Sequence, residues 1–346
     1  MNMENTTTIQ TRLTSIPYKV GETILRISDL SKDFNGKIIL RDVNFEVKDL
    51  VREGMNQGQI VSIIGRSGGG KTTMAKIIAG ILKPTTGTVL VCNGHERPLK
   101  RGEVGFVFQD SIVFDHLTVY DNLLLAAYQG MTREHAEDGA TIHFFRRQYT
   151  WLSAKTYKLR NCSMQRKGDG IIARFLRRSL AALLKNHYTK HILWEKVDEC
   201  MAEFDLAEHA DKNPNQLSGG QKQRLATAMQ VLCSNQFIVF DEPFSGQDPE
   251  RKRKACEVIK KLAQKDEYKT LFIITHDIRS ALWVSDMIII LGRERDDSGA
   301  FKPGSTVFEP VDIAKRQLAW RDASILRDPE FQKLADEIEF DWMPNM

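Results

Sequence analysis

The chain carries Gly65-Arg66-Ser67-Gly68-Gly69-Gly70-Lys71-Thr72-Thr73, which fits the phosphate-binding pattern G-x-x-x-x-G-K-[ST] at every required position. The apolar run 59–64 before it predicts a short buried strand, and the apolar spacing of 73–82 after it predicts a helix. In that context the glycines let backbone N–H groups turn toward a polyphosphate, and the positive end of the helix favours an anion. The segment therefore predicts a nucleoside triphosphate site, with Lys71 reaching the terminal phosphates and Thr72 holding Mg²⁺.

Composition limits the class of protein. The chain has 346 residues, of which 42% are hydrophobic and 27% charged, and this is ordinary for a globular protein with one large domain or two smaller ones. No apolar run approaches the roughly 18 residues of a membrane-spanning helix, and the N-terminus lacks the layout of a secretion signal. The five cysteines form no C-x-x-C pair, which argues against a disulfide framework or a zinc site. We expect a cytoplasmic protein, unless a partner brings it to a membrane.

Three further predicted strands end in polar side chains. These side chains are Gln109, Asp241 with Glu242, and His276. Strands and helices alternate around the phosphate loop, and this pattern predicts a mostly parallel α/β sheet. Because the carboxyl ends of parallel strands lie along one edge of such a sheet, the polar groups can converge on one triphosphate.

A second pair of glycines stands at the start of another predicted helix. The segment reads Leu217-Ser218-Gly219-Gly220-Gln221 and is followed by the helical pattern of 225–229. Backbone N–H groups at a glycine-containing helix start form a second potential anion site.

Residues 131–194 interrupt the alternation of strands and helices. They carry 13 Lys and Arg against 4 Asp and Glu, a net charge of +9. Within them, 172–185 predicts an amphipathic helix with one apolar and one basic face. The simpler interpretation is an inserted helix that packs on the domain and leaves its charges in water. The alternative is a basic surface that docks on anionic lipid head groups or an acidic partner, and nucleic acid is less favoured because the aromatic residues are not spaced as stacking platforms.

Six segments, in their order along the chain, resemble those of an ATP-binding-cassette (ABC) ATPase. They are GRSGGGKTT (65–73), VFQ (107–109), LSGGQKQR (217–224), FIVFDEP (237–243), FSGQD (244–248) and ITHD (274–277). The resemblance implies an α/β fold of the P-loop NTPase (RecA-like) type, with a parallel sheet core, an antiparallel β subdomain and an inserted helical subdomain. The expected parts are a polar N-terminal tail (1–23), an ATPase domain (24–297) with a helical subdomain at about 110–230 that contains the basic insertion 131–194, and a short C-terminal extension (298–346).

The resemblance also implies roles for single residues. Glu242 resembles the general base, His276 the residue that contacts the γ-phosphate and positions that base, and Lys71 the lysine of the phosphate loop. Phe34 resembles an aromatic that stacks on adenine, and a half-buried hairpin Phe is the alternative. The implied ATP-binding set is Phe34, Gly65, Arg66, Ser67, Gly68, Gly69, Gly70, Lys71, Thr72, Thr73, Gln109 and Asp241. The implied Mg²⁺ set is Thr72, Gln109 and Asp241.

Two further segments resemble parts that act between subunits. Leu217, Ser218, Gly219, Gly220 and Gln221 resemble the signature that closes over the ATP of the opposite subunit, and Asp248 resembles the D-loop residue at the dimer interface. The D-loop reads Ser-Gly-Gln-Asp (245–248), where the family more often has Ser-Ala-Leu-Asp. Since the chain has one copy of each motif, the resemblance implies a homodimer or a pair with a second cassette.

The implied function is that of an ATP-hydrolysing subunit of an ABC transporter. Such a subunit drives solute transport through separate transmembrane permease subunits, lies at the inner face of the cell membrane and can work with a solute-binding protein. Import is favoured over export. The alternative is a non-transport ABC ATPase that acts on nucleic acid or ribosomes through the basic insertion. A single cassette and the lack of heptads in 131–194 argue against that alternative.

Overall fold

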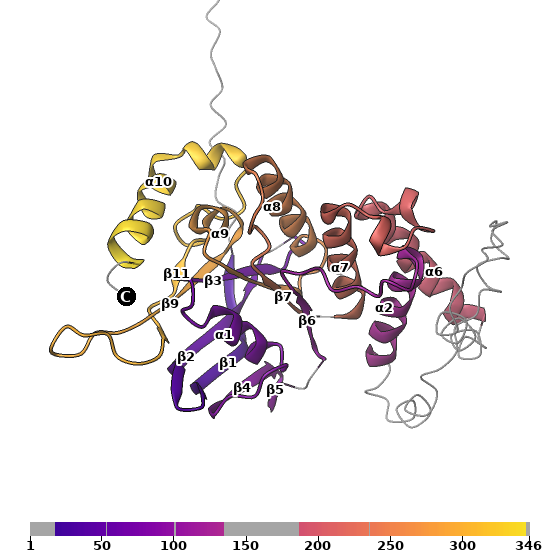
Figure 1. Cartoon of the computed structure of the whole chain (residues 1–346). Coiled ribbons are helices and arrows are strands. Elements are labelled where there is room, and N and C mark those ends of the chain that lie inside the picture. Colours follow the sequence, from indigo (N-terminus) through magenta and orange to yellow (C-terminus); the bar gives the residue numbers. More distant parts are fainter. Residues whose placement is uncertain (1–17, 53, 100–101, 135–186, 235, 344–346) are drawn as a thin grey trace, which may run out of the picture. The chain divides into compact units, whose positions relative to one another are not determined.

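The computed structural model describes residues 18–52, 54–99, 102–134, 187–234 and 236–343. The chain forms two compact units (Figure 1). We call residues 1–101 and 239–346 the sheet unit, and residues 102–238 the helical unit. The domain limits expected from the sequence remain predictions.

A mostly parallel sheet forms the centre of the sheet unit. Its strands run in the order β10 (Thr306–Val307), β9 (Met287–Gly292), β3 (Gln59–Gly65), β8 (Thr270–Thr275) and β7 (Phe237–Asp241). β3 pairs in parallel with both β8 and β9. Every residue of β3, β7 and β8 is buried, as expected for parallel strands that are covered on both faces. The apolar runs of the sequence therefore became the central strands of the sheet.

An antiparallel sheet is the second layer of the same unit. Its strands run in the order β2 (Lys37–Val51), β1 (Lys19–Phe34), β4 (Thr86–Asn93) and β5 (His95–Pro98). Asn35 and Gly36 both have positive φ and close the tight turn between β1 and β2. β1 begins at Lys19, so the end of the segment 1–23 that the sequence assigned to a polar tail pairs with β2.

Helices complete the sheet unit. They are α1 (Lys71–Ile78), α8 (Pro249–Ala263), α9 (Ile278–Val284), α10 (Pro329–Asp336), a 3-10 turn (Ala323–Arg327) and a π-helical turn (Glu337–Trp342). Figure 1 shows α10 beside α9, and Phe331, Leu334 and Ile338 bury their side chains there. The C-terminal segment also adds β10 and β11 (Val311–Asp312), which pair antiparallel with β9. The extension is thus part of the core of this unit.

Asp286 joins three distant parts of the sheet unit. Its side chain is fully buried and accepts hydrogen bonds from Arg52, from the Ile60 backbone N–H at 2.8 Å and from Trp320 Nε1 at 2.7 Å. Burial raises the pKa of Asp286, and the adjacent Arg52 guanidinium opposes that shift. The segment before β3, the start of β9 and the C-terminal extension are therefore tied together by one carboxyl group.

The helical unit contains β6 (Val104–Val107), α2 (Val119–Glu134), α6 (His187–Glu203) and α7 (Gly219–Cys233). Two 3-10 turns, Ala207–His209 and Pro214–Gln216, lie between α6 and α7. α2 and α7 approach closely at Gly130, where a Cβ would lie 2.1 Å from the Leu232 carbonyl oxygen. α2 reaches Glu134 and α6 starts at His187, so both ends of the predicted insertion are helical. Its predicted amphipathic helix, 172–185, lies outside the described residues.

A search of the described residues finds no helix both long and apolar enough to cross a bilayer.

Candidate functional site

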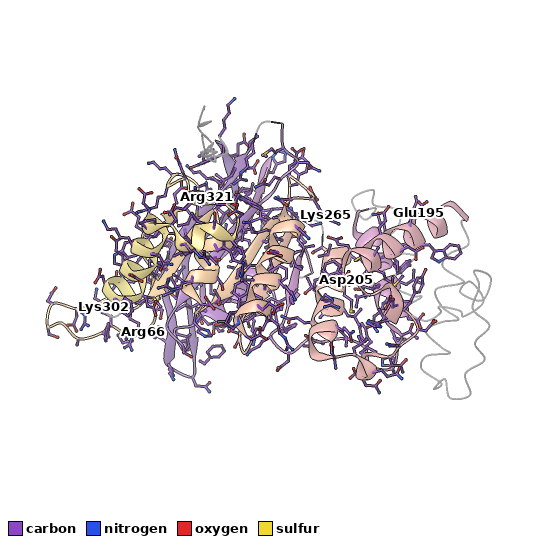
Figure 2. All side chains as sticks on the ribbon, turned by 90° about the horizontal axis from the view of Figure 1, so that it is seen from above. Arg66, Glu195, Asp205, Lys265, Lys302 and Arg321 are labelled. Atoms are coloured by element: carbon purple, nitrogen blue, oxygen red, sulfur yellow. The ribbon has the colours of Figure 1, made fainter. Side chains whose placement is uncertain are left out.

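The phosphate loop, residues 65–72, joins β3 to α1 in the sheet unit. Gly65 ends β3 where an added Cβ would lie 2.4 Å from the Leu291 carbonyl oxygen, so no larger residue fits. Gly68 and Gly70 have φ of 77° and 89°, a region that glycine enters without strain. Gly70 is the N-cap of α1 and has no side chain to cap the helix. The first N–H groups of α1 have no partner within the helix, as at any helix N-terminus, and lie next to the loop. Arg66, labelled in Figure 2, is exposed.

Lys71 is held inside the phosphate loop. Its Nζ donates to the carbonyl oxygens of Gly65 at 2.9 Å and Arg66 at 3.0 Å, and its side chain is only 6% exposed. Burial lowers the pKa of Lys71, and the carboxylate of Glu242, 3.9 Å from Nζ, partly offsets that shift. A phosphate oxygen would be a stronger acceptor than these neutral carbonyls, because both partners would then be charged.

Glu242 follows β7 and meets the end of β8. Its Oε2 accepts from His276 Nδ1 at 2.9 Å and from Thr275 Oγ1 at 3.3 Å. Its side chain is 14% exposed, while that of His276 is 58% exposed. The backbone of Glu242 lies in the left-handed region with φ of 53°, which is a strained conformation for a residue with a side chain. The structure thus brings three predicted residues, Lys71, Glu242 and His276, into one cluster.

Thr72 and Asp241 offer oxygen ligands beside that cluster. Thr72 Oγ1 donates to Asp241 Oδ1 at 3.1 Å, and Asp241 is 8% exposed. Burial raises the pKa of Asp241, and the Thr72 hydroxyl opposes the shift. A hydroxyl and a carboxylate are hard oxygen donors of the kind that Mg²⁺ prefers. The described residues contain no group of three or more His, Cys, Asp or Glu that could hold a metal ion.

Phe34 and Gln109 are also predicted to contact ATP. Phe34 ends β1, and its side chain is 46% exposed, with Lys32 Nζ 4.9 Å from the ring centroid. Gln109 belongs to the helical unit, and its metal role stays a prediction. Ser67 is exposed, whereas Gly69 and Thr73 are partly exposed.

The signature segment, Leu217–Gln221, starts α7 in the helical unit. Ser218 is the N-cap: its Oγ accepts from the Gln221 backbone N–H at 3.3 Å, and Gln221 Oε1 accepts from the Ser218 N–H at 2.8 Å. This reciprocal pair is a capping box. Among the described residues, none would lie within 4 Å of an added Cβ at Gly219 or Gly220. The described part of the chain therefore leaves the glycine face of the signature uncovered.

Asp248 is the N-cap of α8. Its carboxylate accepts from the Arg251 backbone N–H at 3.0 Å, and this bond lowers the pKa of Asp248. The helix cap accounts for an Asp at this position, and its part in an interface remains a prediction. Gly246, where the D-loop departs from the family pattern, has φ of 67°, so glycine suits that turn.

The sequence interpretation missed Thr275. This residue is fully buried, donates to Glu242 and accepts from the Asp277 backbone N–H at 3.0 Å. The available signal was its position as the only polar residue between an apolar run and His276.

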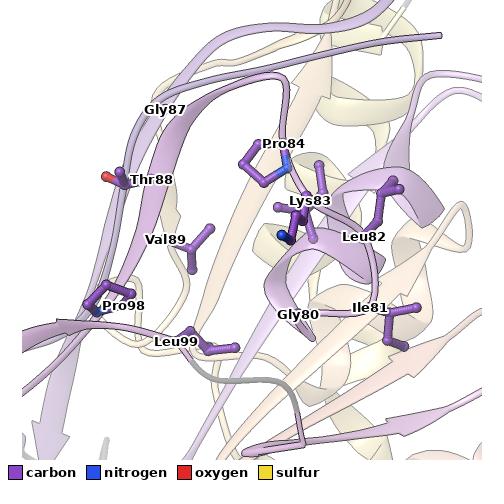
Figure 3. Close-up of a pocket in the computed structure, with 11 residues that line it drawn as sticks. Gly80, Ile81, Leu82, Lys83, Pro84, Gly87, Thr88, Val89, Pro98 and Leu99 are labelled. Atoms are coloured by element: carbon purple, nitrogen blue, oxygen red, sulfur yellow. The ribbon is translucent and has the colours of Figure 1, made fainter.

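The sheet unit also has a pocket of about 420 Å³ at the C-terminal end of α1 (Figure 3). It is lined mainly by apolar side chains, among them Ile77, Ile81, Leu82, Val89 and Leu99. The phosphate loop stands at the opposite end of α1, and no predicted site residue lines the pocket. The pocket is therefore not the triphosphate site.

Comparison with known sequences identifies a family and several relatives. Residues 49–245 match the model of the family described as ABC transporter. The chain is 27% identical over 270 residues to the "Spermidine/putrescine import ATP-binding protein PotA" of Spiroplasma citri, covering 78% of this chain and 59% of that protein. It is 27% identical over 274 residues to the "Sulfate/thiosulfate import ATP-binding protein CysA" of Escherichia coli K12, covering 78% of this chain and 58% of that protein. The matched region thus spans less than two thirds of these relatives.

Solved structures share the fold. The chain resembles cbiO1 from Clostridium perfringens with a TM-score of 0.56 at 19% identity, covering 92% of this chain and 96% of that one. It resembles the bacterial ABC transporter cassette MJ0796, solved as a dimer, with a TM-score of 0.52 at 24% identity, covering 84% and 99%. The predicted α/β P-loop NTPase fold is confirmed. Given the family match over more than half its length, the chain belongs to the ABC transporter family.

Proposed function

We propose that the chain is the ATP-binding and ATP-hydrolysing subunit of an ABC importer. The observation that carries the proposal is the position of Glu242, whose carboxylate is oriented by His276 and Thr275 and lies 3.9 Å from Lys71. A carboxylate that is oriented beside a phosphate loop suits a general base for water attack on a γ-phosphate.

ATP binding would use groups that the sheet unit already presents. The N–H groups of the loop and of the start of α1 would surround the phosphates, and Lys71 would exchange its two carbonyl partners for phosphate oxygens. Phe34 would stack on the adenine with its exposed ring. Thr72, Asp241 and Gln109 would hold Mg²⁺, and the ion would neutralise charge on the phosphates when bound.

Hydrolysis would then use the Glu242 cluster. A water molecule would attack the γ-phosphorus while Glu242 accepts its proton, and the bond from that phosphorus to the bridging oxygen of ADP would break. His276 donates to Oε2 in the structure, so it would keep the carboxylate turned toward the water. The water oxygen would end in the inorganic phosphate, and the bridging oxygen would leave with ADP.

The signature requires a second cassette in this proposal. Its open glycine face, Gly219 and Gly220, would close over the ATP of a second copy or of a related subunit, and Asp248 would lie at the interface. The pair would drive transmembrane permease subunits from the inner face of the cell membrane, with a solute-binding protein as a further partner. Contact of the basic insertion with anionic lipid stays a prediction, because most of that segment, 135–186, lies outside the described residues.

We propose no cargo. The two relatives are named for spermidine and putrescine, which are cations, and for sulfate and thiosulfate, which are anions. The nucleic-acid alternative is not proposed, because the matched relatives are import ATP-binding proteins.

The substitution Glu242→Gln tests the proposal. It keeps the hydrogen-bonding shape of the side chain and removes the base, so ATP hydrolysis should fall by about 10²–10⁴-fold while ATP binding is retained. With Mg²⁺ and ATP the variant should accumulate as a dimer in size-exclusion chromatography with light scattering. Undiminished hydrolysis would contradict the role of Glu242. Lys71→Ala is the matched control, since it should lose nucleotide affinity and form no ATP-dependent dimer.

A further inference from the structure

His209 lies outside every motif of the sequence and contacts the signature. It ends the 3-10 turn Ala207–His209, twelve residues before Gln221. Its Nε2 lies 2.6 Å from Gln221 Nε2, and its Nδ1 lies 3.0 Å from Lys212 Nζ. The partly buried imidazole thus stands between the signature and a lysine.

The orientation of the Gln221 side chain decides the direction of the first bond. Its Oε1 already accepts from the Ser218 backbone N–H at 2.8 Å, which turns its amide nitrogen toward His209. An amide nitrogen only donates, so His209 must accept through Nε2. This requires a neutral imidazole with its proton on Nδ1.

Lys212 demands the opposite tautomer. An ammonium group has only donors, so its contact with Nδ1 needs a lone pair on that nitrogen. A neutral imidazole has one such lone pair in total, and a protonated imidazole has none. Gln221 and Lys212 therefore compete for one acceptor. Lys212 is exposed and can turn to water, whereas the amide of Gln221 is fixed by Ser218.

We propose that His209 is a positioning residue for the signature segment. In its Nδ1–H tautomer it accepts from the Gln221 amide and so holds the capping box that sets the first turn of α7. Lys212 opposes this arrangement because its ammonium group competes with the Gln221 amide for the single lone pair of the imidazole. The inference rests on the proposed function in one respect: it is the closing of the signature over a second cassette's ATP that makes the position of this turn matter for activity.

Substitutions of His209 and Lys212 should differ in their effect on dimer formation. In the Glu242→Gln background, His209→Ala removes the acceptor and should raise the ATP concentration for half-maximal dimer formation by about fivefold, the value of one hydrogen bond. Lys212→Met removes the competitor and should leave that concentration unchanged or lower it. His209→Asn, whose carbonyl oxygen can accept, should lie closer to the parent than His209→Ala does.

Two controls separate positioning from nucleotide binding and from folding. All variants should bind a fluorescent ATP analogue equally well as monomers, because the phosphate loop lies in the sheet unit. Their thermal unfolding midpoints should agree within the spread of the parent. Equal weakening by His209→Ala and Lys212→Met, or no effect of His209→Ala on dimer formation, would overturn the proposal.

A nucleotide-free measurement tests the hydrogen bond by itself. In ¹⁵N spectra of the full chain, His209 should show a protonated Nδ1 and an unprotonated Nε2, and His209→Ala should speed solvent exchange of the Gln221 side-chain amide. The opposite tautomer would refute the inference. If the Glu242→Gln parent forms no dimer with ATP, the proposed function fails, while these spectra still decide the contact between His209 and Gln221.

Discussion

At the scale of single residues, the backbone conformation of Glu242 determines where its side chain points. Glu242 has φ of 53°, a conformation that costs a residue with a side chain about 1–3 kcal/mol. Its N–H donates to the Ile274 carbonyl at 2.8 Å and its carbonyl accepts from the Ser245 N–H at 3.2 Å, so the sheet edge and the following turn hold it there. This backbone conformation directs the carboxylate toward His276 and Thr275.

Thr275→Val should weaken catalysis without weakening nucleotide binding. The substitution removes one of two hydrogen bonds to Glu242 Oε2 while keeping the branched shape of the side chain. We expect a kcat lower by about fivefold, as for one lost hydrogen bond, with an unchanged affinity for ATP. Steady-state ATPase assays measure both. Thr270→Val, at the other end of β8, is the matched control, and an equal loss in both variants would contradict the role of Thr275.

At the scale of elements, strands with a strong pattern could be predicted and the rest could not. The apolar runs of β3, β7 and β8 and the polar residues after them gave the sheet edge and most of the site. Two-residue strands such as β10 and β11 are too short to show periodicity, and β1 already begins at Lys19, which pairs with Val51 of β2. Contacts such as Thr275 to Glu242 or His209 to Gln221 join side chains of different elements, and residue spacing does not encode them.

A substitution in the first turn of α7 tests whether a second cassette contacts this turn. No atom of the described residues would lie within 4 Å of a methyl group at Gly219, and Ala in place of Gly should stabilise a helix by about 0.5–1 kcal/mol. If the ATP of a second cassette occupies that space, Gly219→Ala should cut ATPase activity at least about tenfold while the thermal midpoint stays or rises. Full activity would argue against a close contact at this turn.

Gly65→Ala is the contrasting variant. Its methyl group would lie 2.4 Å from the Leu291 carbonyl oxygen, so this variant should lose about 1–3 kcal/mol of stability as well as activity. The thermal midpoint and the ATPase rate are measured for Gly65→Ala and Gly219→Ala. A clash within the fold lowers both values, whereas a clash with a partner lowers only the ATPase rate.

At the scale of the molecule, the C-terminal extension is part of the sheet unit through Asp286. This fully buried carboxyl group is compensated by Arg52 and by hydrogen bonds from Ile60 and Trp320. The sequence predicted a short C-terminal extension, and this link could not be predicted because Arg52, Asp286 and Trp320 lie far apart in the sequence.

Arg52→Met should therefore be strongly destabilising although it lies outside the phosphate site. It leaves a buried carboxyl group without its cation, which costs about 3–5 kcal/mol. Urea unfolding followed by tryptophan fluorescence measures the loss. Adding Asp286→Asn should recover part of the stability, because the uncompensated charge is then gone. A loss below about 1 kcal/mol for Arg52→Met alone would show that the pair does little for the fold.

The hydrogen bonds of Lys71 and Thr72 bear on the order in which ligands arrive. Lys71 donates to two loop carbonyls, and the Thr72 hydroxyl donates to Asp241. A divalent cation that bound without nucleotide would have to break the hydrogen bond between Thr72 and Asp241. It would gain only one carboxylate ligand in return, so we expect it to bind weakly on its own. The metal should bind together with the nucleotide, as a Mg²⁺–ATP complex. Mg²⁺ alone should leave the thermal midpoint unchanged and Mg²⁺ with ATP should raise it, whereas equal shifts would mean that the cation has a resident site of its own.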